Sequence, residues 1–157
     1  MPRRKSARTT VATVGYQAAT MESFLRTLQA AGVELLVDVR AVASSRRPGF
    51  SKSRLASNLE EVGIGYVHLR GLGTPAAGRA AARAGRHARM RSIFRDHLRT
   101  LEAQAELDEL RELATGGRRV CLLCFEADPE HCHRTLVAEA LAARLPIDVV
   151  HLRPAGA

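Results

Sequence analysis

Residues 120–134 read VCLLCFEADPEHCHR. An apolar run ends in Cys124 and an acidic loop follows it, which is typical of a buried strand that leads into a turn. We expect a helix to begin at Asp128-Pro129, because Asp is a good N-cap and Pro suits the first helical position. The triplet Cys132-His133-Arg134 then lies in the first helical turn, where the helix dipole favours an anion. The stretch therefore predicts a strand, a reactive loop and a helix in succession.

The same alternation of strand and helix patterns continues on both sides of this stretch. Residues 33–39, VELLVDV, are nearly continuous apolar sequence, as in a strand that is buried on both faces of a parallel sheet. Residues 76–88 are rich in Ala, Arg and Gly and predict a mobile loop or a poorly packed helix. We expect further strands at 10–14, 64–69, 119–124 and 147–151, and helices near 20–31, 51–62, 89–114 and 129–144.

Alternating elements of this kind indicate an α/β fold. We expect a single-domain three-layer α/β/α arrangement of the Rossmann-like class, with a mostly parallel sheet of about five strands. The domain should span residues 10–152, after a disordered basic tail at 1–9 and before a short tail at 153–157. No apolar run approaches the length of a membrane span, and the basic start lacks the apolar segment of a signal peptide. Three cysteines, an odd number, suit reduced thiols, so we expect a cytoplasmic protein without membrane contact.

The charge of the chain points to the kind of partner. A net charge of +8 over 157 residues favours an anion, either a small molecule or a nucleic acid, although high Arg and Ala usage can equally reflect genomic base composition. Aromatic residues make up only 4% of the chain, so few rings are available to stack on unpaired bases. One basic segment is either a candidate nucleic-acid contact or a solvated surface, and it contains Arg79, Arg83, Arg86, Arg89, Arg91 and Arg95.

The polar and reactive residues concentrate in the loops that follow the predicted strands. Ligands of parallel sheets bind beyond the carboxyl ends of the strands, so these loops predict one pocket. The guanidinium groups of Arg40, Arg46 and Arg134 are predicted to hold phosphate or carboxylate there. The other candidate binding residues are Gly15, Tyr16, Asp38, Ser45, Phe50 and Tyr66.

Five residues are candidates for catalysis. Cys124 ends a strand before a loop and a helix, as the nucleophile does in rhodanese-like and phosphatase-like domains. Cys132, near a helix N-terminus and beside His133, should have a lowered thiol pKa. The other interpretation is that both cysteines are small buried thiols that pack beneath the loop. Glu126 and His68 are the candidate proton-transfer groups.

Metal binding is a further alternative at the same place. Cys124, Cys132 and His133 offer ligands suited to zinc, as do Glu126 and His131. Yet their spacing lacks the paired Cys-x-x-Cys of structural zinc sites, and adjacent ligands in a helix point in different directions. We therefore expect no metal and no other cofactor.

Several blocks of sequence carry a family resemblance: Thr13-Val14-Gly15-Tyr16, Val37-Asp38-Val39-Arg40, Ser45-Arg46 with Phe50, Gly63-Ile64-Gly65-Tyr66, Leu72-Gly73, Leu123-Cys124-Phe125-Glu126 and Cys132-His133-Arg134. Through these blocks the chain resembles family 488 of the domains of unknown function, over residues 11–151. The resemblance implies an α/β fold and a shared loop site, and it implies no particular activity. Two residues depart from the family pattern: Ala43, where Pro is frequent, and Gln17, where a small hydroxyl residue is common.

Three functional hypotheses follow from these observations. The leading one is a small cytosolic enzyme with an anion pocket at the C-terminal ends of the strands, for a phosphorylated or nucleotide-like substrate. The second is a non-catalytic nucleic-acid-binding module that uses the Arg-rich segment. The third is rhodanese-like or phosphatase-like cysteine chemistry. The first and third require that loops distant in sequence meet at one edge of the sheet.

Overall fold

The computed structural model describes residues 8–155. Most of the tail predicted at 1–9 lies outside the described residues, as do the last two residues of the tail predicted at 153–157. Thr9, which was expected in the tail, already belongs to the first strand. None of the helices among the described residues is long and apolar enough to cross a membrane.

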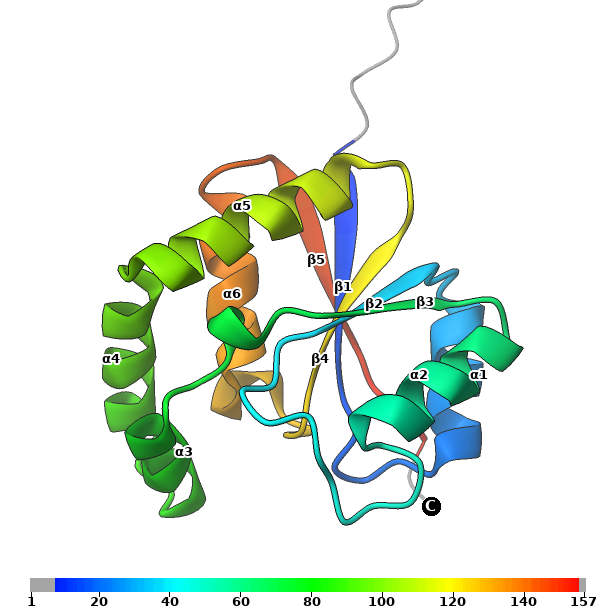
Figure 1. Ribbon diagram of the computed structural model, residues 1–157, viewed down its shortest axis with the longest axis horizontal. Coiled ribbons are helices and arrows are strands. Elements are labelled where there is room, and N and C mark those ends of the chain that lie inside the picture. Colours follow the sequence, from blue (N-terminus) through cyan, green and yellow to red (C-terminus); the bar gives the residue numbers. More distant parts are fainter. Residues whose placement is uncertain (1–7, 156–157) are drawn as a thin grey trace, which may run out of the picture.

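Five parallel strands form one twisted sheet, as predicted (Figure 1). The sheet order is β3-β2-β4-β1-β5. Its members are β1 (Thr9–Gly15), β2 (Leu35–Asp38), β3 (Gly65–His68), β4 (Val120–Cys124) and β5 (Ile147–Leu152). The inner strands β1, β2 and β4 are largely buried because helices cover both faces of the sheet, whereas the edge strands β3 and β5 are partly exposed.

Helices cover the two faces of the sheet and complete a three-layer α/β/α fold of the Rossmann-like class. Helices α1 (Met21–Ala30) and α2 (Lys52–Glu61) pack on one face, and four helices lie on the other side (Figure 1). Alternate residues of β4 divide between two cores: Cys121 joins the α1 and α2 side, and Leu122 joins the opposite side. The helices of that side are α3 (Ala76–Arg83), α4 (His87–Leu98), α5 (Leu101–Thr115) and α6 (His133–Ala142).

One structural detail decides between two sequence-based alternatives, and two others differ from the expectations. Of the two alternatives predicted for residues 76–88, a mobile loop or a poorly packed helix, residues 76–83 form a helix, α3, and its Ala81 is buried against the core. The single helix predicted over 89–114 is two helices, because the Thr100 hydroxyl caps a new helix by accepting from the Ala103 amide. The helix predicted from Pro129 begins four residues later, at His133.

The delayed start of α6 follows from the local backbone. Residues Pro129–His131 form a short 3₁₀ turn, η2, which Asp128 caps by accepting from the amide of Glu130 at 2.9 Å. Cys132 then adopts an extended conformation, with φ −126° and ψ 141°, and precedes the helix as its N-cap residue. The predicted cap therefore exists, but it closes a turn instead of opening the helix.

The strand order brings three loop origins together. Gly15 at the end of β1 lies opposite Cys124 at the end of β4, and Asp38 at the end of β2 lies opposite Leu123. A Cβ atom at position 15 would lie only 1.7 Å from the backbone oxygen of Glu126. The loops that follow β1 and β4 are thus in close contact, and glycine is required between them.

Candidate functional site

A cavity of about 850 Å³ lies at the C-terminal edge of the sheet. Its wall combines the loops after β1, β2 and β4 with residues of α3 and α4. Seven of the predicted site residues line it, and seven do not. Those in the wall are Tyr16, Arg40, Ser45, Arg46, Cys124, Glu126 and His133, whereas Gly15, Asp38, Phe50, Tyr66, His68, Cys132 and Arg134 lie outside the lining.

Asp38 and Arg40 form a buried ion pair beside the cavity. The Asp38 carboxylate accepts from Arg40 Nε at 2.9 Å and Nη2 at 2.7 Å, and from the Tyr66 hydroxyl at 2.6 Å. Arg40 Nη1 donates to the Tyr16 hydroxyl at 3.0 Å and to the Phe50 carbonyl at 2.8 Å. Burial opposes the charged guanidinium, but the hydrogen bonds and charge of Asp38 outweigh it and raise the pKa of Arg40. The predicted binding residues thus hold one another and fix the loop after β2.

Burial also raises the pKa of the Tyr66 hydroxyl, and its hydrogen bond to Asp38 raises it further. The phenol therefore stays protonated and donates to the carboxylate near neutral pH. Tyr66 completes the buried network instead of presenting its hydroxyl to the cavity.

Arg134 is fully buried beneath the loop that follows β4. Its Nε donates to Thr13 Oγ1 at 3.2 Å, Nη1 donates to the Glu126 carbonyl at 2.5 Å, and Nη2 donates to the Ala127 carbonyl at 3.4 Å. The guanidinium therefore ties the loop to β1 from behind the cavity wall. Arg134 is not among the residues that line the cavity.

Two other predicted residues shape the surroundings of the cavity. His68 Nε2 lies 2.7 Å from the Arg40 carbonyl oxygen and lines a separate, smaller hollow, so His68 is not among the groups that face the main cavity. Ser45 accepts from the Arg47 amide at 3.1 Å through its hydroxyl, while its own amide donates to Ser51 Oγ at 2.9 Å. These bonds fold the loop that carries Arg46.

Five arginines line the cavity, and sequence reasoning selected two of them, Arg40 and Arg46, as anion ligands. Arg40 is paired with Asp38, and the other four come from two places. Arg46 and Arg47 come from the loop after β2, and Arg79 and Arg83 come from α3. The spacing of Arg79 and Arg83, four residues apart, places both on one helix face, which was the signal available in the sequence. None of the four has an ion-pair partner within residues 8–155.

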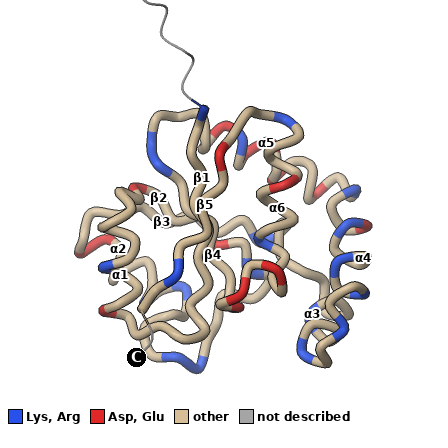
Figure 2. The backbone as a smooth tube through the Cα atoms, turned by 180° about the vertical axis from the view of Figure 1, so that it is seen from behind, with Lys and Arg blue, Asp and Glu red and all other residues tan. Residues whose placement is uncertain are grey.

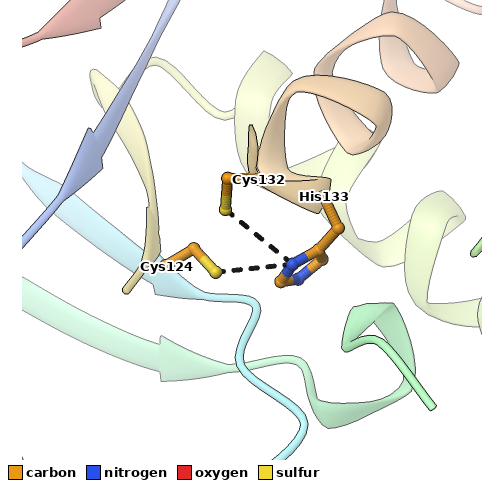
Figure 3. Close-up of side chains that lie close together, drawn as sticks. All are labelled: Cys124, Cys132 and His133. Atoms are coloured by element: carbon orange, nitrogen blue, oxygen red, sulfur yellow. Dashed lines mark hydrogen bonds between the residues drawn. The ribbon is translucent and has the colours of Figure 1, made fainter. Parts of the chain in front are cut away.

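Cys124, Cys132 and His133 converge on one point (Figure 3). Cys124 and His133 form part of the floor of the cavity, and Cys132 lies behind them. His133 Nδ1 lies 3.4 Å from Cys124 Sγ and 3.9 Å from Cys132 Sγ. All three residues are buried, and Glu126 Oε2 lies 3.4 Å from Cys124 Sγ. The extended backbone of Cys132 turns adjacent side chains to the same point, so the divergence expected for neighbours in a helix does not occur.

The thiol of Cys132 differs from its expected state. Burial raises its pKa well above the ordinary value, neighbouring Cys124 adds to the rise, and the hydrogen bond with His133 offsets only part of it. The predicted lowering by a helix N-terminus is therefore wrong for Cys132. Burial lowers the pKa of His133, but its hydrogen bond and charge interaction with Cys132 outweigh this, and the pKa is raised overall.

Sequence reasoning missed two rings of the cavity wall. The His87 ring, at the start of α4, stacks on His131 of η2 with centroids 4.0 Å apart and an angle of 4° between the planes. Phe125 is 40% exposed and lies edge-on to Tyr16, with ring centroids 5.4 Å apart. These contacts join helices and loops that are far apart in the chain, so no local pattern revealed them.

Neither the comparison with curated proteins nor that with solved structures finds a match. The comparison with protein families finds one over residues 20–141, which include the buried Asp38–Arg40 pair and the Cys124–Cys132–His133 cluster. The matching family is the domain of unknown function DUF488. The chain belongs to this family, as the resemblance in its strand ends and loops suggested.

Proposed function

We propose that this protein is an enzyme that binds a phosphorylated, nucleotide-like small molecule in the cavity at the strand ends. The observation that carries the proposal is the wall of four arginines, Arg46, Arg47, Arg79 and Arg83, which face one cavity and lack carboxylate partners within residues 8–155. Guanidinium groups bind phosphate and carboxylate in bidentate fashion. The volume of about 850 Å³ lies within the range of small-molecule sites.

The cavity wall that holds these four arginines, here called the arginine wall, contains nitrogen atoms without hydrogen-bond partners among the described residues. Arg47 donates through Nη2 to the Ala19 carbonyl, but its Nε is buried without a hydrogen-bond partner in the described part of the chain. The same holds for Nδ1 of His87. Buried polar groups are normally paired, so these two unpaired nitrogens of lining residues support a polar ligand. Arg79, by contrast, donates to the Thr74 carbonyl at 2.9 Å, which fixes its position on α3.

The loop after β4 forms another part of the cavity wall, and its residues suit the base and the sugar of a nucleotide. The exposed ring of Phe125 offers a face on which a base can stack. Glu126 and Asp128 also line the cavity, and their carboxylates can accept hydrogen bonds from sugar hydroxyls. Glu126 is the candidate proton-transfer group, because it lies beside the buried floor.

Covalent cysteine chemistry has less support from this geometry. Rhodanese-like and phosphatase-like sites need backbone amides that surround the anion next to the thiolate. Here the amide of Ala127 donates to Gln17 Oε1, and the carbonyls of Glu126 and Ala127 point to Arg134. The loop after Cys124 is thus bound from both sides by protein groups.

A nucleic-acid contact is the second candidate. Figure 2 shows Lys and Arg positions along α3 and α4, and Arg86, Arg89 and Arg95 are exposed there. Exposed arginines along one pair of helices can neutralise the phosphates of a backbone. This surface lies on the helices that border the cavity, so one experiment can examine both candidates.

Calorimetric titration with adenosine monophosphate, inorganic phosphate and a single-stranded oligonucleotide tests the two candidates. We expect adenosine monophosphate to bind more tightly than phosphate. Arg46→Ala and Arg79→Ala should each weaken it by about 1.5–3 kcal/mol, or roughly tenfold to a hundredfold. Arg111→Ala, an exposed arginine of α5 outside the cavity, is the matched control and should leave binding unchanged.

Two outcomes would count against the enzyme. One is failure of every nucleotide and sugar phosphate in a panel to bind. The other is tight oligonucleotide binding with a steep salt dependence that Arg86→Ala and Arg89→Ala weaken and Arg46→Ala does not. The second outcome would support the nucleic-acid module.

A further inference from the structure

We propose that Cys124, Cys132 and His133 form a zinc site at the floor of the cavity, with the fourth coordination position open to the cavity. The two sulfur atoms and the ring nitrogen lie within 4.8 Å of one another. Tetrahedral zinc, with Zn–S near 2.3 Å and Zn–N near 2.0–2.1 Å, places sulfur and nitrogen ligands about 3.6 Å apart. The distances from His133 Nδ1 to the two sulfurs, 3.4 and 3.9 Å, lie on either side of this value (Figure 3).

The orientation of the imidazole supports metal binding independently. His133 Nε2 lies 2.7 Å from the carbonyl oxygen of Val39. A carbonyl oxygen only accepts hydrogen bonds, so Nε2 must carry the proton, and in the neutral ring the lone pair of Nδ1 then faces the two sulfurs. This is the arrangement in which metal-ligating histidines are held, with the far nitrogen bonded to a carbonyl or carboxylate.

The ligands stand on well-anchored elements. Cys124 ends the central strand β4, and His133 is the first residue of α6. The His133 ring contacts the Phe94 ring of α4, with the ring centroids 5.1 Å apart. Both cysteines and His133 are at most 6% exposed, so little movement is needed to complete the site.

The chemistry of the ligands selects the metal. Thiolate and imidazole ligands favour zinc over magnesium or calcium, which prefer oxygen. Three protein ligands with an open fourth position are typical of catalytic zinc sites, because structural sites use four protein ligands. Cys124 and His133 line the cavity, and Glu126 lies next to Cys124, so a water or a substrate oxygen can occupy the fourth position.

The expectation of a metal-free protein rested on two grounds, the lack of a Cys-x-x-Cys pair and the divergence of adjacent ligands in a helix. The extended backbone of Cys132 removes the second ground, because Cys132 precedes α6. The spacing between Cys124 and Cys132 is bridged by the loop and by η2. The zinc site does not depend on the proposed substrate, and each can fail without the other.

The test measures metal content and metal spectra on the full-length reduced protein, purified without chelators. We expect about one zinc per chain. After removal of the metal, added cobalt(II) should give the intense sulfur-to-cobalt charge-transfer bands of thiolate ligation and the visible bands of a tetrahedral ion. Cys124→Ala, Cys132→Ala and His133→Ala should each lose most of the bound metal.

Cys121→Ala is the matched control, because Cys121 is equally buried but lies on the opposite face of β4. It should keep the metal and the cobalt bands. If a ligand variant fails to fold, the zinc affinity of the wild-type protein still tests the proposal. It is measured by letting the protein compete with a chromophoric chelator for added zinc. The proposal is overturned if the reduced, folded wild-type protein binds neither zinc nor cobalt, or if Cys124 and Cys132 are joined in a disulfide that excludes metal. Adenosine monophosphate binding is measured separately, so failure of the zinc proposal can be distinguished from failure of the proposed nucleotide binding.

Discussion

The carboxylate of Asp38 holds the guanidinium of Arg40 through two hydrogen bonds, at 2.9 and 2.7 Å, although the residues are only two apart in sequence. Both side chains are buried, with 0% of Asp38 and 5% of Arg40 exposed. A polar pair in this position fixes the backbone where β2 gives way to the loop that carries Arg46 and Arg47. Arg40 lines the cavity, and its pairing with Asp38 also supports the loop that carries Arg46 and Arg47.

Breaking this pair on one side should destabilise the protein strongly. Arg40→Met leaves a buried carboxylate without its cation, and we expect a loss of about 3–5 kcal/mol in the free energy of unfolding. The double variant Asp38→Leu with Arg40→Met should lose less than the sum of the single losses, because it leaves no unpaired buried charge. Urea unfolding of the wild type and the three variants measures the coupling.

An exposed ion pair serves as the control for that cycle. Arg26 and Glu22 are 67% and 78% exposed, so removing their contact should cost less than about 1 kcal/mol. Additive losses at positions 38 and 40 would show that the buried pair is not coupled, contrary to its geometry.

Gly15→Ala should separate the loops after β1 and β4. Its Cβ atom would lie 1.7 Å from the backbone oxygen of Glu126, which cannot rotate away as a side chain would. We expect a loss of at least about 1–3 kcal/mol, as for overpacking in a core, together with weaker ligand binding in the cavity. Thermal unfolding and calorimetric titration measure the two effects.

Gly116→Ala is the corresponding control. The nearest neighbour of its Cβ, the Glu112 carbonyl, is at 3.4 Å, and its φ of −79° suits alanine. Its effect should stay within about 0.5 kcal/mol. Equal losses at positions 15 and 116 would contradict the contact between the two loops.

The sequence was sufficient for the fold because its inner strands are buried on both faces. Residues 33–39 read as continuous apolar sequence, and β2 lies within them, next to β4 in the middle of the sheet. The break between α4 and α5 was missed because apolar spacing continues across it, and only the Thr100 hydroxyl marks the new start. Hydrophobic periodicity reports which face is buried and is insensitive to a change of helix direction.

The site was predictable as a set of loops but not as a set of contacts. That reactive residues would gather near the ends of β1, β2 and β4 follows from the parallel topology. Whether an arginine faces the cavity or its back depends on tertiary packing. For this reason the predicted ligand Arg134 lies outside the lining, whereas Arg47, which was not selected, lies in it. The convergence of Cys132 and His133 depends on one extended residue ahead of α6, which sequence patterns place only to within a few residues.

Arg134 and Arg46 should therefore respond oppositely to substitution. Arg134→Met removes the donor from the part-buried carbonyls of Glu126 and Ala127, and an unsatisfied buried acceptor costs up to about 1–3 kcal/mol. Arg46→Ala removes an exposed side chain and should leave the free energy of unfolding within about 0.5 kcal/mol of wild type while it weakens anion binding. Urea unfolding and phosphate titration of both variants check this. A stable Arg134→Met protein with specifically lost binding would place Arg134 in the ligand site after all.

His151 should make the protein less stable in mild acid. Burial lowers its pKa from the ordinary value of 6.5, and the positive charges of Arg134 and Arg153 lower it further. The unfolded chain then binds a proton more readily than the folded chain, so stability falls as the pH drops below about 6.5. His151 Nδ1 also lies 2.6 Å from Thr13 Oγ1, which already accepts from Arg134, so a neutral ring suits the site.

His151→Asn removes the titrating ring and should flatten this part of the stability profile. Urea unfolding of the wild type and the variant, between about pH 8 and pH 5.5, isolates the effect as the difference between the two slopes, because carboxylates titrate in both proteins. The wild type should lose more stability than the variant over this window. Parallel profiles of stability against pH would mean that the pKa of His151 is the same in the folded and unfolded chains. The charges of Arg134 and Arg153 would then not shift this pKa.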